Sequence, residues 1–330
     1  MATMLGSTGL SVSRMGLGLA SLGRPGYINL GHAGDLAAEY DVEAMERRAH
    51  VVLDAAWQAG IRYFDAARSY GRAEEFLASW LQARRIGPDA VTVGTKWGYT
   101  YTAGWETTAP VHEIKDHSLS NLQRQSAESR EILGSWIKLH QIHSATLESG
   151  VLEDPEVLRE LSRLRERGWA IGLSVSGVRQ RETIERALEV QLDGIRLFDC
   201  VQATWNLLER SATTALEAAH DAGLGVIVKE ALANGRLTRR NHNPEFAEAR
   251  RRLEHEARRL GASLDALALA AVLGRGWVDT VLSGATTTDQ LDSNVTALGL
   301  TWDDEAEAQC STLVESPESY WSTRARLPWN

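Results

Sequence analysis

Short runs of apolar and β-branched residues alternate with longer amphipathic stretches along almost the whole chain. The short runs have the length of buried strands, and the longer stretches place apolar residues at helical spacing. This alternation is typical of repeated strand–helix units that form a parallel sheet. Eight strands are predicted, at residues 15–18, 62–66, 91–96, 137–143, 170–175, 200–204, 225–229 and 279–282.

The helices predicted between these strands carry recognisable end signals. Gly60, Gly168 and Gly223 each follow a helical stretch, as a left-handed C-cap requires. Asp154 and Asn243 each precede a proline, which suits a capping side chain before Pro at the first helical position. The predicted helices span residues 42–59, 73–84, 120–133, 155–167, 179–189, 211–222, 244–274 (as two helices) and 288–298.

Eight strand–helix units close naturally into a (β/α)8 TIM barrel, and we expect residues 1–330 to form one such domain. The alternative, an open doubly wound sheet, would carry a glycine-rich turn after its first strand. Segment 16–21 lacks the third glycine of that turn, and no helix follows it directly. We therefore interpret Gly16 and Gly18 as packing glycines.

Three connections are too long for plain turns, namely 20–41, 97–119 and 315–330. We expect all three to lie as loops over the C-terminal face of the barrel, where the sites of this fold form. The chain has 11 tryptophans, and several of them lie in these connections together with tyrosines. The aromatic residues predicted to line a substrate pocket there are Tyr27, Trp97, Tyr99, Trp105 and Trp321.

Composition narrows the possible partners. The chain has 44 acidic and 35 basic residues, and its net charge of −9 argues against nucleic acid or an anionic membrane as a partner. The longest apolar run, 266–274, is about half of a bilayer span. We see no signal peptide and expect a cytoplasmic protein. The two cysteines, Cys200 and Cys310, are too few for a disulfide framework or a zinc cluster. The oligomeric state stays open.

Chemically versatile side chains follow three consecutive strands. Asp65 ends the second strand and Tyr70 follows in its loop, Lys96 ends the third strand, and His143 ends the fourth. Parallel strands of a barrel deliver such residues to one mouth. Period-two alternation places Lys96 on the same inward face as the small Gly94, which leaves room for the long side chain.

These four residue types suit a proton-transfer site. An ammonium beside Tyr70 should lower the pKa of the phenol and make it a proton donor near neutral pH. Asp65 would hold Lys96 in place and balance its charge. His143 could hydrogen-bond a substrate carbonyl and share the proton path.

The segments FDAARSYG, VGTKWG and LHQIH resemble the motifs of the aldo-keto reductase superfamily. The resemblance runs from an N-terminal β-hairpin at 4–13 to about residue 298. It implies a barrel that binds a nicotinamide cofactor, NADP, without a Rossmann domain. It also assigns Asp65, Tyr70, Lys96 and His143 as the catalytic tetrad, acting on a small carbonyl or sugar substrate without a metal.

Further segments resemble the cofactor-binding parts of that superfamily. Ser174 and Gln202 stand where the family holds the carboxamide of the nicotinamide. The stretch 282–294 resembles the loop and helix start that bind the adenosine phosphate end, and its backbone amides suit an anion. The resemblance assigns to that end Gly284, Thr286, Gln290 and Asn294.

The chain also departs from the family pattern. Val175 replaces the usual Asn, Lys229 replaces an aromatic residue of many members, and Gln290 replaces an Arg that pairs with the 2′-phosphate. NAD is therefore a possible cofactor beside NADP. We expect positive charge for the cofactor to come from Lys229 and Arg236, with Arg239 or Arg240 in reserve.

Three other functions stay open at this stage. One is an aldose dehydrogenase that runs in the oxidative direction on the same fold. Another is a Schiff-base lyase with Lys96 as the nucleophile. The third is a cofactor-binding subunit without turnover. By strand parity His140 is expected to face a helix, away from the site, and Cys200 is interpreted as a buried thiol.

Overall fold

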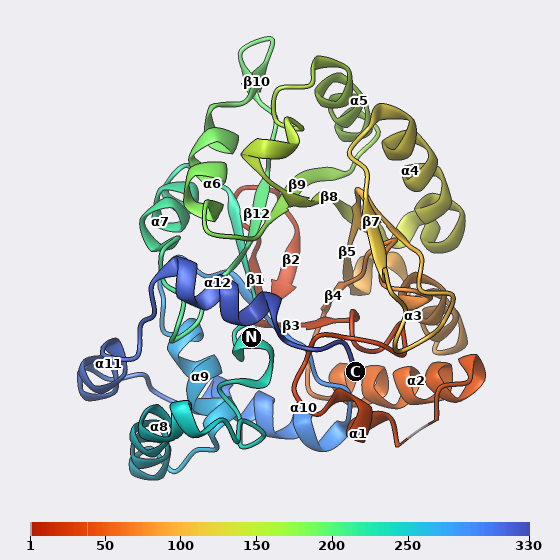
Figure 1. The fold of residues 1–330 in the computed structure, drawn as a ribbon. Coiled ribbons are helices and arrows are strands. Elements are labelled where there is room, and N and C mark those ends of the chain that lie inside the picture. The colour runs from red at the N-terminus through yellow and green to blue at the C-terminus, as the bar shows by residue number, and fades with distance from the viewer. Residues whose placement is uncertain (1, 38) are drawn as a thin grey trace.

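The apolar runs of the sequence pair side by side into a closed barrel of eight parallel strands (Figure 1). The computed structural model describes residues 2–37 and 39–330. All eight predicted strands are confirmed, and each pairs with the next in chain order until the last pairs with the first. They are β3 (Met15–Gly18), β4 (Tyr63–Asp65), β5 (Thr92–Trp97), β8 (Ile137–Ala145), β9 (Ala170–Val175), β12 (Cys200–Thr204), β13 (Gly225–Lys229) and β14 (Thr280–Ser283).

Helices surround the strands, as Figure 1 shows. The stretch predicted as two helices divides into α8 (Ala247–Arg259) and α9 (Leu264–Leu273). The predicted caps are confirmed: Asp154 and Asn243 accept backbone hydrogen bonds, and the three C-cap glycines have positive φ. The other helices that cover the barrel are α2 (Val42–Gln58), α3 (Ala73–Ala83), α4 (Leu119–Leu133), α5 (Pro155–Glu166), α6 (Gln180–Glu189), α7 (Thr213–Asp221) and α10 (Thr288–Val295), and α11 (Asp304–Ser311) packs against α8.

The N-terminal hairpin closes one end of the barrel. Strands β1 (Ala2–Met4) and β2 (Ser11–Ser13) pair antiparallel, and between them the Gly6 amide donates to Asp279 at 3.0 Å. Leu5 and Val12 are fully buried in one cluster with Tyr63, Leu139, Cys200 and Ile227. Because this end is filled with apolar side chains, a ligand can reach the barrel only from the opposite, C-terminal face.

Small residues inside the barrel make room for one large ring. A Cβ added at Gly94 would lie 2.6 Å from the Tyr63 hydroxyl oxygen, and one added at Gly16 would lie 2.7 Å from a Tyr63 ring carbon. The prediction that Gly94 faces inward with Lys96 is confirmed, and Gly16 is a packing glycine. The same interpretation is wrong for Gly18, where the nearest atom to an added Cβ lies 3.6 Å away, an ordinary contact. The Tyr63 hydroxyl uses this space to donate to Asp65 at 2.9 Å, below the barrel mouth.

The three long connections are partly ordered into elements that the hydrophobic pattern did not predict. The first contains α1 (His32–Leu36), and the second contains a hairpin of β6 (Tyr99–Tyr101) and β7 (Glu113–Lys115). A two-stranded ribbon, β10 (Gln191–Leu192) with β11 (Ile195–Arg196), follows α6. The prediction of a loop at 315–330 is wrong, since α12 (Pro317–Ala325) forms there. Ser316 caps this helix by accepting from the Ser319 amide, and a proline follows at the first helical position.

No described helix combines the length and the apolar character that a bilayer crossing requires.

Candidate active site

An ion pair inside the barrel mouth joins β4 and β5. Lys96 donates to a carboxylate oxygen of Asp65, and both residues are 1% exposed. The ammonium also donates to the Ala66 carbonyl at 3.1 Å. Asp65 accepts three further hydrogen bonds, from the Tyr63 hydroxyl at 2.9 Å and from the side-chain amides of Gln202 at 2.9 Å and Gln141 at 3.3 Å. This network fixes the lysine and satisfies its carboxylate partner.

Tyr70 lies over this ion pair, held by the loop between β4 and α3. The Lys96 ammonium is 4.9 Å from the centroid of the Tyr70 ring. The Tyr70 hydroxyl is 3.5 Å from Nε2 of His143, and the two rings meet edge to face. The structure therefore brings together all four residues of the predicted tetrad at the C-terminal mouth of the barrel.

The expected pKa of Tyr70 requires correction. Burial raises the pKa of Tyr70 well above its ordinary value, and Asp65 adds to the rise, while Arg24 opposes it. The ammonium is not among the main contributions, because Asp65 pairs directly with Lys96 and offsets its charge. Tyr70 is consequently a neutral phenol near pH 7 and can donate a proton.

His143 is held as a neutral imidazole beside Tyr70. Burial, followed by the charges of Lys96 and Arg24, lowers the pKa of His143 well below its ordinary value. Its Nδ1 atom is 3.3 Å from the buried Ser69 hydroxyl, and its backbone carbonyl is 2.9 Å from Nε2 of His117. A neutral imidazole fixed in this way can donate a hydrogen bond to a carbonyl oxygen without carrying charge.

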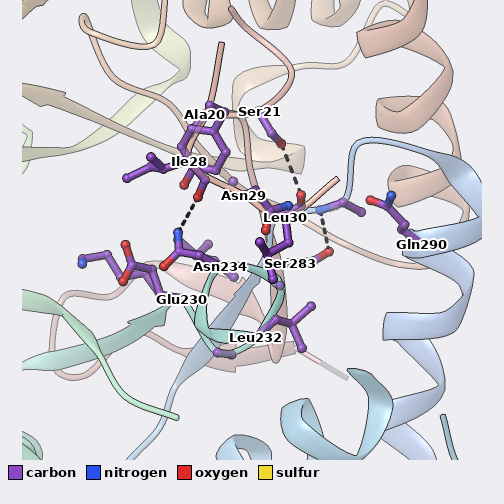
Figure 2. A pocket seen from close by; sticks show the side chains of 18 of the residues that line it. Ala20, Ser21, Ile28, Asn29, Leu30, Glu230, Leu232, Asn234, Ser283 and Gln290 are labelled. Atoms are coloured by element: carbon purple, nitrogen blue, oxygen red, sulfur yellow. Dashed lines mark hydrogen bonds between the residues drawn. The ribbon is translucent and has the colours of Figure 1, made fainter. Parts of the chain in front are cut away.

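A cavity of about 400 Å³ opens above the tetrad and extends along the barrel mouth. Asp65, Tyr70 and His143 line one end of it, whereas Lys96 does not reach its wall. Figure 2 shows Glu230 and Gln290 on opposite sides of this pocket. Asn234 donates to the Ile28 carbonyl at 2.9 Å, so the connections after β3 and after β13 meet across it (Figure 2).

Most of the predicted cofactor residues line this cavity: Ser174, Gln202, Lys229, Gly284, Gln290 and Asn294. The Ser174 oxygen accepts from the Ser144 amide at 2.9 Å, which leaves its own proton free to be donated. The Gln290 side-chain oxygen accepts from the Thr286 amide at 2.9 Å. Thr286 itself lies behind this wall and is fully buried, so its hydroxyl does not face the cavity.

The expected source of positive charge also requires correction. Arg236 is 8% exposed, pairs with Glu315 and lies outside the cavity wall, because its guanidinium packs near the Tyr320 ring. Lys229 does line the cavity and donates to the Ser176 and Thr204 hydroxyls. Burial lowers the pKa of Lys229 to about 8. The reserve candidates Arg239 and Arg240 both line the cavity.

Of the five aromatic residues predicted for the substrate pocket, Tyr27 lines the cavity. The other four do not, for separate packing reasons. Trp97 is fully buried in the core, Trp105 donates to the Tyr40 carbonyl, and Trp321 belongs to a second apolar cluster near α8 and α9. Tyr99 supports the site from behind, since its ring lies 5.0 Å from the His143 ring.

The sequence pattern did not single out Arg24 and Glu113, two residues at the tetrad end of the cavity. Arg24 is 2% exposed, donates to the Ser69 carbonyl and to Glu113 on β7, and has its guanidinium carbon 4.9 Å from the Trp329 ring centroid. Arg24, Glu113 and Trp329 all line the cavity. Trp329 stacks on His112 at 4.0 Å. An isolated Arg in a loop carries no motif, so these contacts required the tertiary structure.

A second ion pair lines the same end. Arg324 of α12 binds Glu230, which follows β13. Burial alone would raise the pKa of Glu230, but the charges of Arg324 and Lys229 lower it to about 2. The predicted position of His140 is confirmed: it faces α4, where its Nε2 lies 3.0 Å from the Ser126 hydroxyl. Cys200 is a buried free thiol, as interpreted.

Among the described residues no group of three or more His, Cys, Asp or Glu side chains is arranged to hold a metal ion.

Comparison with known proteins decides the family. The profile of the Aldo/keto reductase family matches residues 14–315, which is most of the chain. The chain belongs to the aldo/keto reductase family. As a member it is an oxidoreductase of the barrel class that uses a nicotinamide cofactor.

Its similarity to individual aldo/keto reductases is moderate and extends over nearly full length. It is 26% identical to a pyridoxal 4-dehydrogenase of Microbacterium luteolum over 97% of this chain and 95% of the relative. It is 25% identical to an L-galactose dehydrogenase of Arabidopsis thaliana over 94% and 93%, and to an NADH-specific methylglyoxal reductase of Escherichia coli over 95% and 98%. The holo form of a Bacillus halodurans aldo-keto reductase shares its fold, with a TM-score of 0.72 at 23% identity over 96% of this chain and 97% of the other.

The cavity fits the dinucleotide that aldo/keto reductases use. It runs from the tetrad to the start of α10, and a Cβ built at Gly284 would meet no atom within 4 Å, so the wall is open there. Ser174 and Gln202 stand near the tetrad, where they could hold a carboxamide, and Gln290 and Asn294 stand at the far end.

Proposed function

We propose that this aldo/keto reductase interconverts a small carbonyl compound and its alcohol, with Tyr70 as the general acid and base. The observation that carries the proposal is the meeting of Tyr70 and His143 at one end of the cavity, above the Lys96–Asp65 pair. When bound, the nicotinamide supplies or accepts the hydride.

The chain's own residues supply the rest of the chemistry. In the reductive direction Nε2 of His143 holds the carbonyl oxygen, and the Tyr70 hydroxyl gives its proton to that oxygen as the alcohol forms. In the oxidative direction Tyr70 takes the proton of the alcohol. Lys96 and Asp65 position Tyr70 from below, and Ser174 and Gln202 orient the carboxamide of the cofactor.

Replacing Tyr70 by Phe tests this assignment. We expect kcat to fall by at least about 100-fold in both directions, while the dissociation constant of the cofactor stays within about twofold. Tyr40→Phe, a change outside the cavity, serves as the control and should leave kcat unchanged. Retention of turnover by Tyr70→Phe would exclude Tyr70 as the proton donor.

Two substrate classes compete, lipophilic carbonyls to be reduced and sugars to be oxidised. The ion pairs Arg24–Glu113 and Arg324–Glu230 at the tetrad end favour a substrate with hydroxyl groups. A purely apolar substrate would remove these ion pairs from water without offering hydrogen bonds to their remaining donor and acceptor sites. The relatives named for pyridoxal and for L-galactose also act on hydroxylated carbonyl compounds, which supports an aldose dehydrogenase.

A substrate screen with a matched pair of variants distinguishes the two classes. Glu113→Gln should lower kcat/KM for aldoses by about tenfold relative to that for simple aliphatic aldehydes, and the ratio is the readout because Glu113 also raises the pKa of Tyr70. Glu106→Gln, on the exposed part of the same connection, is the control. Equal losses for both substrate classes would remove the support for a sugar substrate.

The remaining alternatives receive less support. Lys96 is buried in its ion pair and does not line the cavity, so a carbonyl substrate in the cavity has no direct access to the amine that a Schiff-base lyase would use. A cofactor-binding subunit without turnover would not need the four tetrad residues in contact. Tight cofactor binding without turnover on any carbonyl or sugar would favour that subunit.

A further inference from the structure

Two carboxylates stand at the end of the cavity opposite the tetrad. Asp265 lies in the first turn of α9 and Asp289 in the first turn of α10, and both line the cavity beside Gln290 and Asn294. Asn294 is 2% exposed and hydrogen-bonds to Asp265, Ser283 and the Gln290 carbonyl. Its amide nitrogen donates to Asp265 at 2.9 Å, and its oxygen accepts from the Ser283 hydroxyl at 2.9 Å. Asp265 is thus fixed in place with a carboxylate oxygen left to accept from a ligand.

The elements that form this end of the cavity, β14 and α10, contribute no basic side chain to it. No Lys or Arg occurs in the sequence from residue 276 to residue 323, a stretch that includes β14 and α10. Arg275 precedes that stretch, but it binds Glu307 and does not line the cavity. Arg240 reaches the wall from the connection after β13, and Asp35 pairs with it there. Arg239, on the same connection, makes no ion pair with any described residue.

We infer that Asp265 and Asp289 select NAD(H) over NADP(H), an inference that rests on the proposed function and on the adenosine end lying at α10. A ribose hydroxyl donates well to a carboxylate, and acidic residues serve this purpose in other dinucleotide sites. A 2′-phosphate in the same place carries about two negative charges and would lie close to two carboxylates. The neutral Gln290 stands there in place of a cation. Repulsion of the wrong ligand is a general route to specificity.

Arg239, the arginine of this connection that has no ion pair with a described residue, suits the part of the cofactor that both dinucleotides share. Arg239 can face the pyrophosphate, which carries its charge in NAD and NADP alike. It therefore contributes to affinity without discriminating between them. The cofactor preference then depends on the charges of α9 and α10. These charges favour NAD(H), whereas the family resemblance alone implies NADP.

Binding measurements test this inference independently of turnover. Dissociation constants for NAD⁺ and NADP⁺ can be read from tryptophan fluorescence, because Trp329 lines the cavity. Calorimetry with 5′-AMP and with 2′,5′-ADP isolates the adenosine end. We expect the wild-type protein to bind NAD⁺ at least about 100-fold more tightly than NADP⁺, and 5′-AMP more tightly than 2′,5′-ADP.

Variants that remove or add a charge identify the residues that determine the preference between NAD⁺ and NADP⁺. The double change Asp265→Asn with Asp289→Asn should narrow the NAD⁺/NADP⁺ affinity ratio by about tenfold, since Asn keeps an acceptor oxygen and loses only the charge. Gln290→Arg, made separately, should improve NADP⁺ binding by about tenfold or more. The control Asp292→Asn removes an exposed charge of α10 that does not line the cavity, and the ratio should stay within about twofold.

The outcomes separate this inference from the function on which it rests. Tighter binding of NADP⁺ by the wild-type protein, or an unchanged ratio in a folded double variant, overturns the role of the two aspartates. A ratio that changes only in Arg239→Ala would assign the choice to Arg239 and also overturn it. If neither dinucleotide nor either adenosine fragment binds, the proposed function itself fails.

Discussion

The guanidinium carbon of Arg24 lies 5.3 Å from the centroid of the Tyr70 ring, on a residue that no motif marks. Lys96 approaches the same ring to 4.9 Å but is paired with Asp65 inside the barrel. Because Asp65 offsets the ammonium, Arg24 is the cation that lowers the pKa of Tyr70 against the larger effects of burial and Asp65. Tyr70, the proposed proton donor, is thus influenced electrostatically from the loop after β3 as well as from the barrel.

Removing the Arg24 charge should therefore impair the oxidative direction most. In Arg24→Met the pKa of Tyr70 rises further, so less phenolate is available to accept the alcohol proton. We expect the oxidative kcat at neutral pH to fall by roughly tenfold and its rise with pH to move to more alkaline values. The measurement is a pH profile of kcat in both directions.

Two other variants make this test specific. Arg24→Lys keeps the charge and should restore most of the profile. Arg72→Met removes a half-exposed arginine beside the same loop and should leave it unchanged. A loss confined to KM, with no shift of the pH profile, would show that Arg24 acts on substrate binding alone.

The proposed roles of Tyr70 and His143 predict a different pH dependence of kcat for the two directions. The pKa of Tyr70 is raised and that of His143 is lowered, so neither group changes its charge near pH 7. The reductive kcat should stay nearly constant between about pH 6 and pH 8, because it needs the protonated phenol. The oxidative kcat should rise with pH, because it needs the phenolate. A reductive rate that falls through a neutral pKa would contradict this assignment.

The Arg324–Glu230 pair attaches α12 to the barrel mouth and should contribute pH-dependent stability. The pKa of Glu230 is about 2 in the folded protein against an ordinary value of 4.5. A depressed carboxyl pKa stabilises the fold above about pH 4.5, and this contribution is lost as the pH falls toward 2. Arg324→Met should therefore lower the free energy of unfolding by about 3 kcal/mol at neutral pH and by less as the solution is acidified.

Denaturant unfolding at several pH values measures this effect. Arg326→Met changes an exposed arginine just beyond the same helix and should alter the unfolding free energy by less than about 0.5 kcal/mol. A cost for Arg324→Met that is the same at every pH would mean that the residue acts through packing on the Trp321 ring instead.

The barrel was predictable because each strand carries its own signal. Apolar runs, capping glycines and Asx-Pro caps are local, so the sequence reveals them before any contact is known. The 97–119 connection differs, since its hairpin pairs three residues on each side, most of them half-buried, and has no apolar alternation to detect. The helix at 317–325 was missed although Ser316 and Pro317 form a start signal, because its weak apolar face resembles a loop pattern.

The site was predictable to the extent that its residues end strands. Asp65, Lys96 and His143 follow from strand position, and Tyr70 follows from its motif. Arg236 was misplaced because its partner Glu315 lies far away in the sequence. Trp97 follows the inward-facing Lys96, so strand parity turns its side chain away from the barrel interior and into the core between the strands and the helices. The prediction that Trp97 lines the pocket overlooked this parity.

The close contact between Gly94 and the Tyr63 ring inside the barrel offers a stability test at residues that do not line the cavity. In Gly94→Ala the new methyl group would lie 2.6 Å from the Tyr63 hydroxyl oxygen, so the ring must shift within a closed barrel. We expect the free energy of unfolding to fall by about 1–3 kcal/mol, as for other overpacked cores. Gly87→Ala, where nothing lies within 4 Å, is the control and should be neutral or slightly stabilising. Adding Tyr63→Phe should recover part of the loss, because it removes the atom that the methyl group meets. Equal unfolding free energies for the Gly94 and Gly87 variants would show that the barrel accommodates the methyl group, and that Tyr63 does not require glycine at position 94.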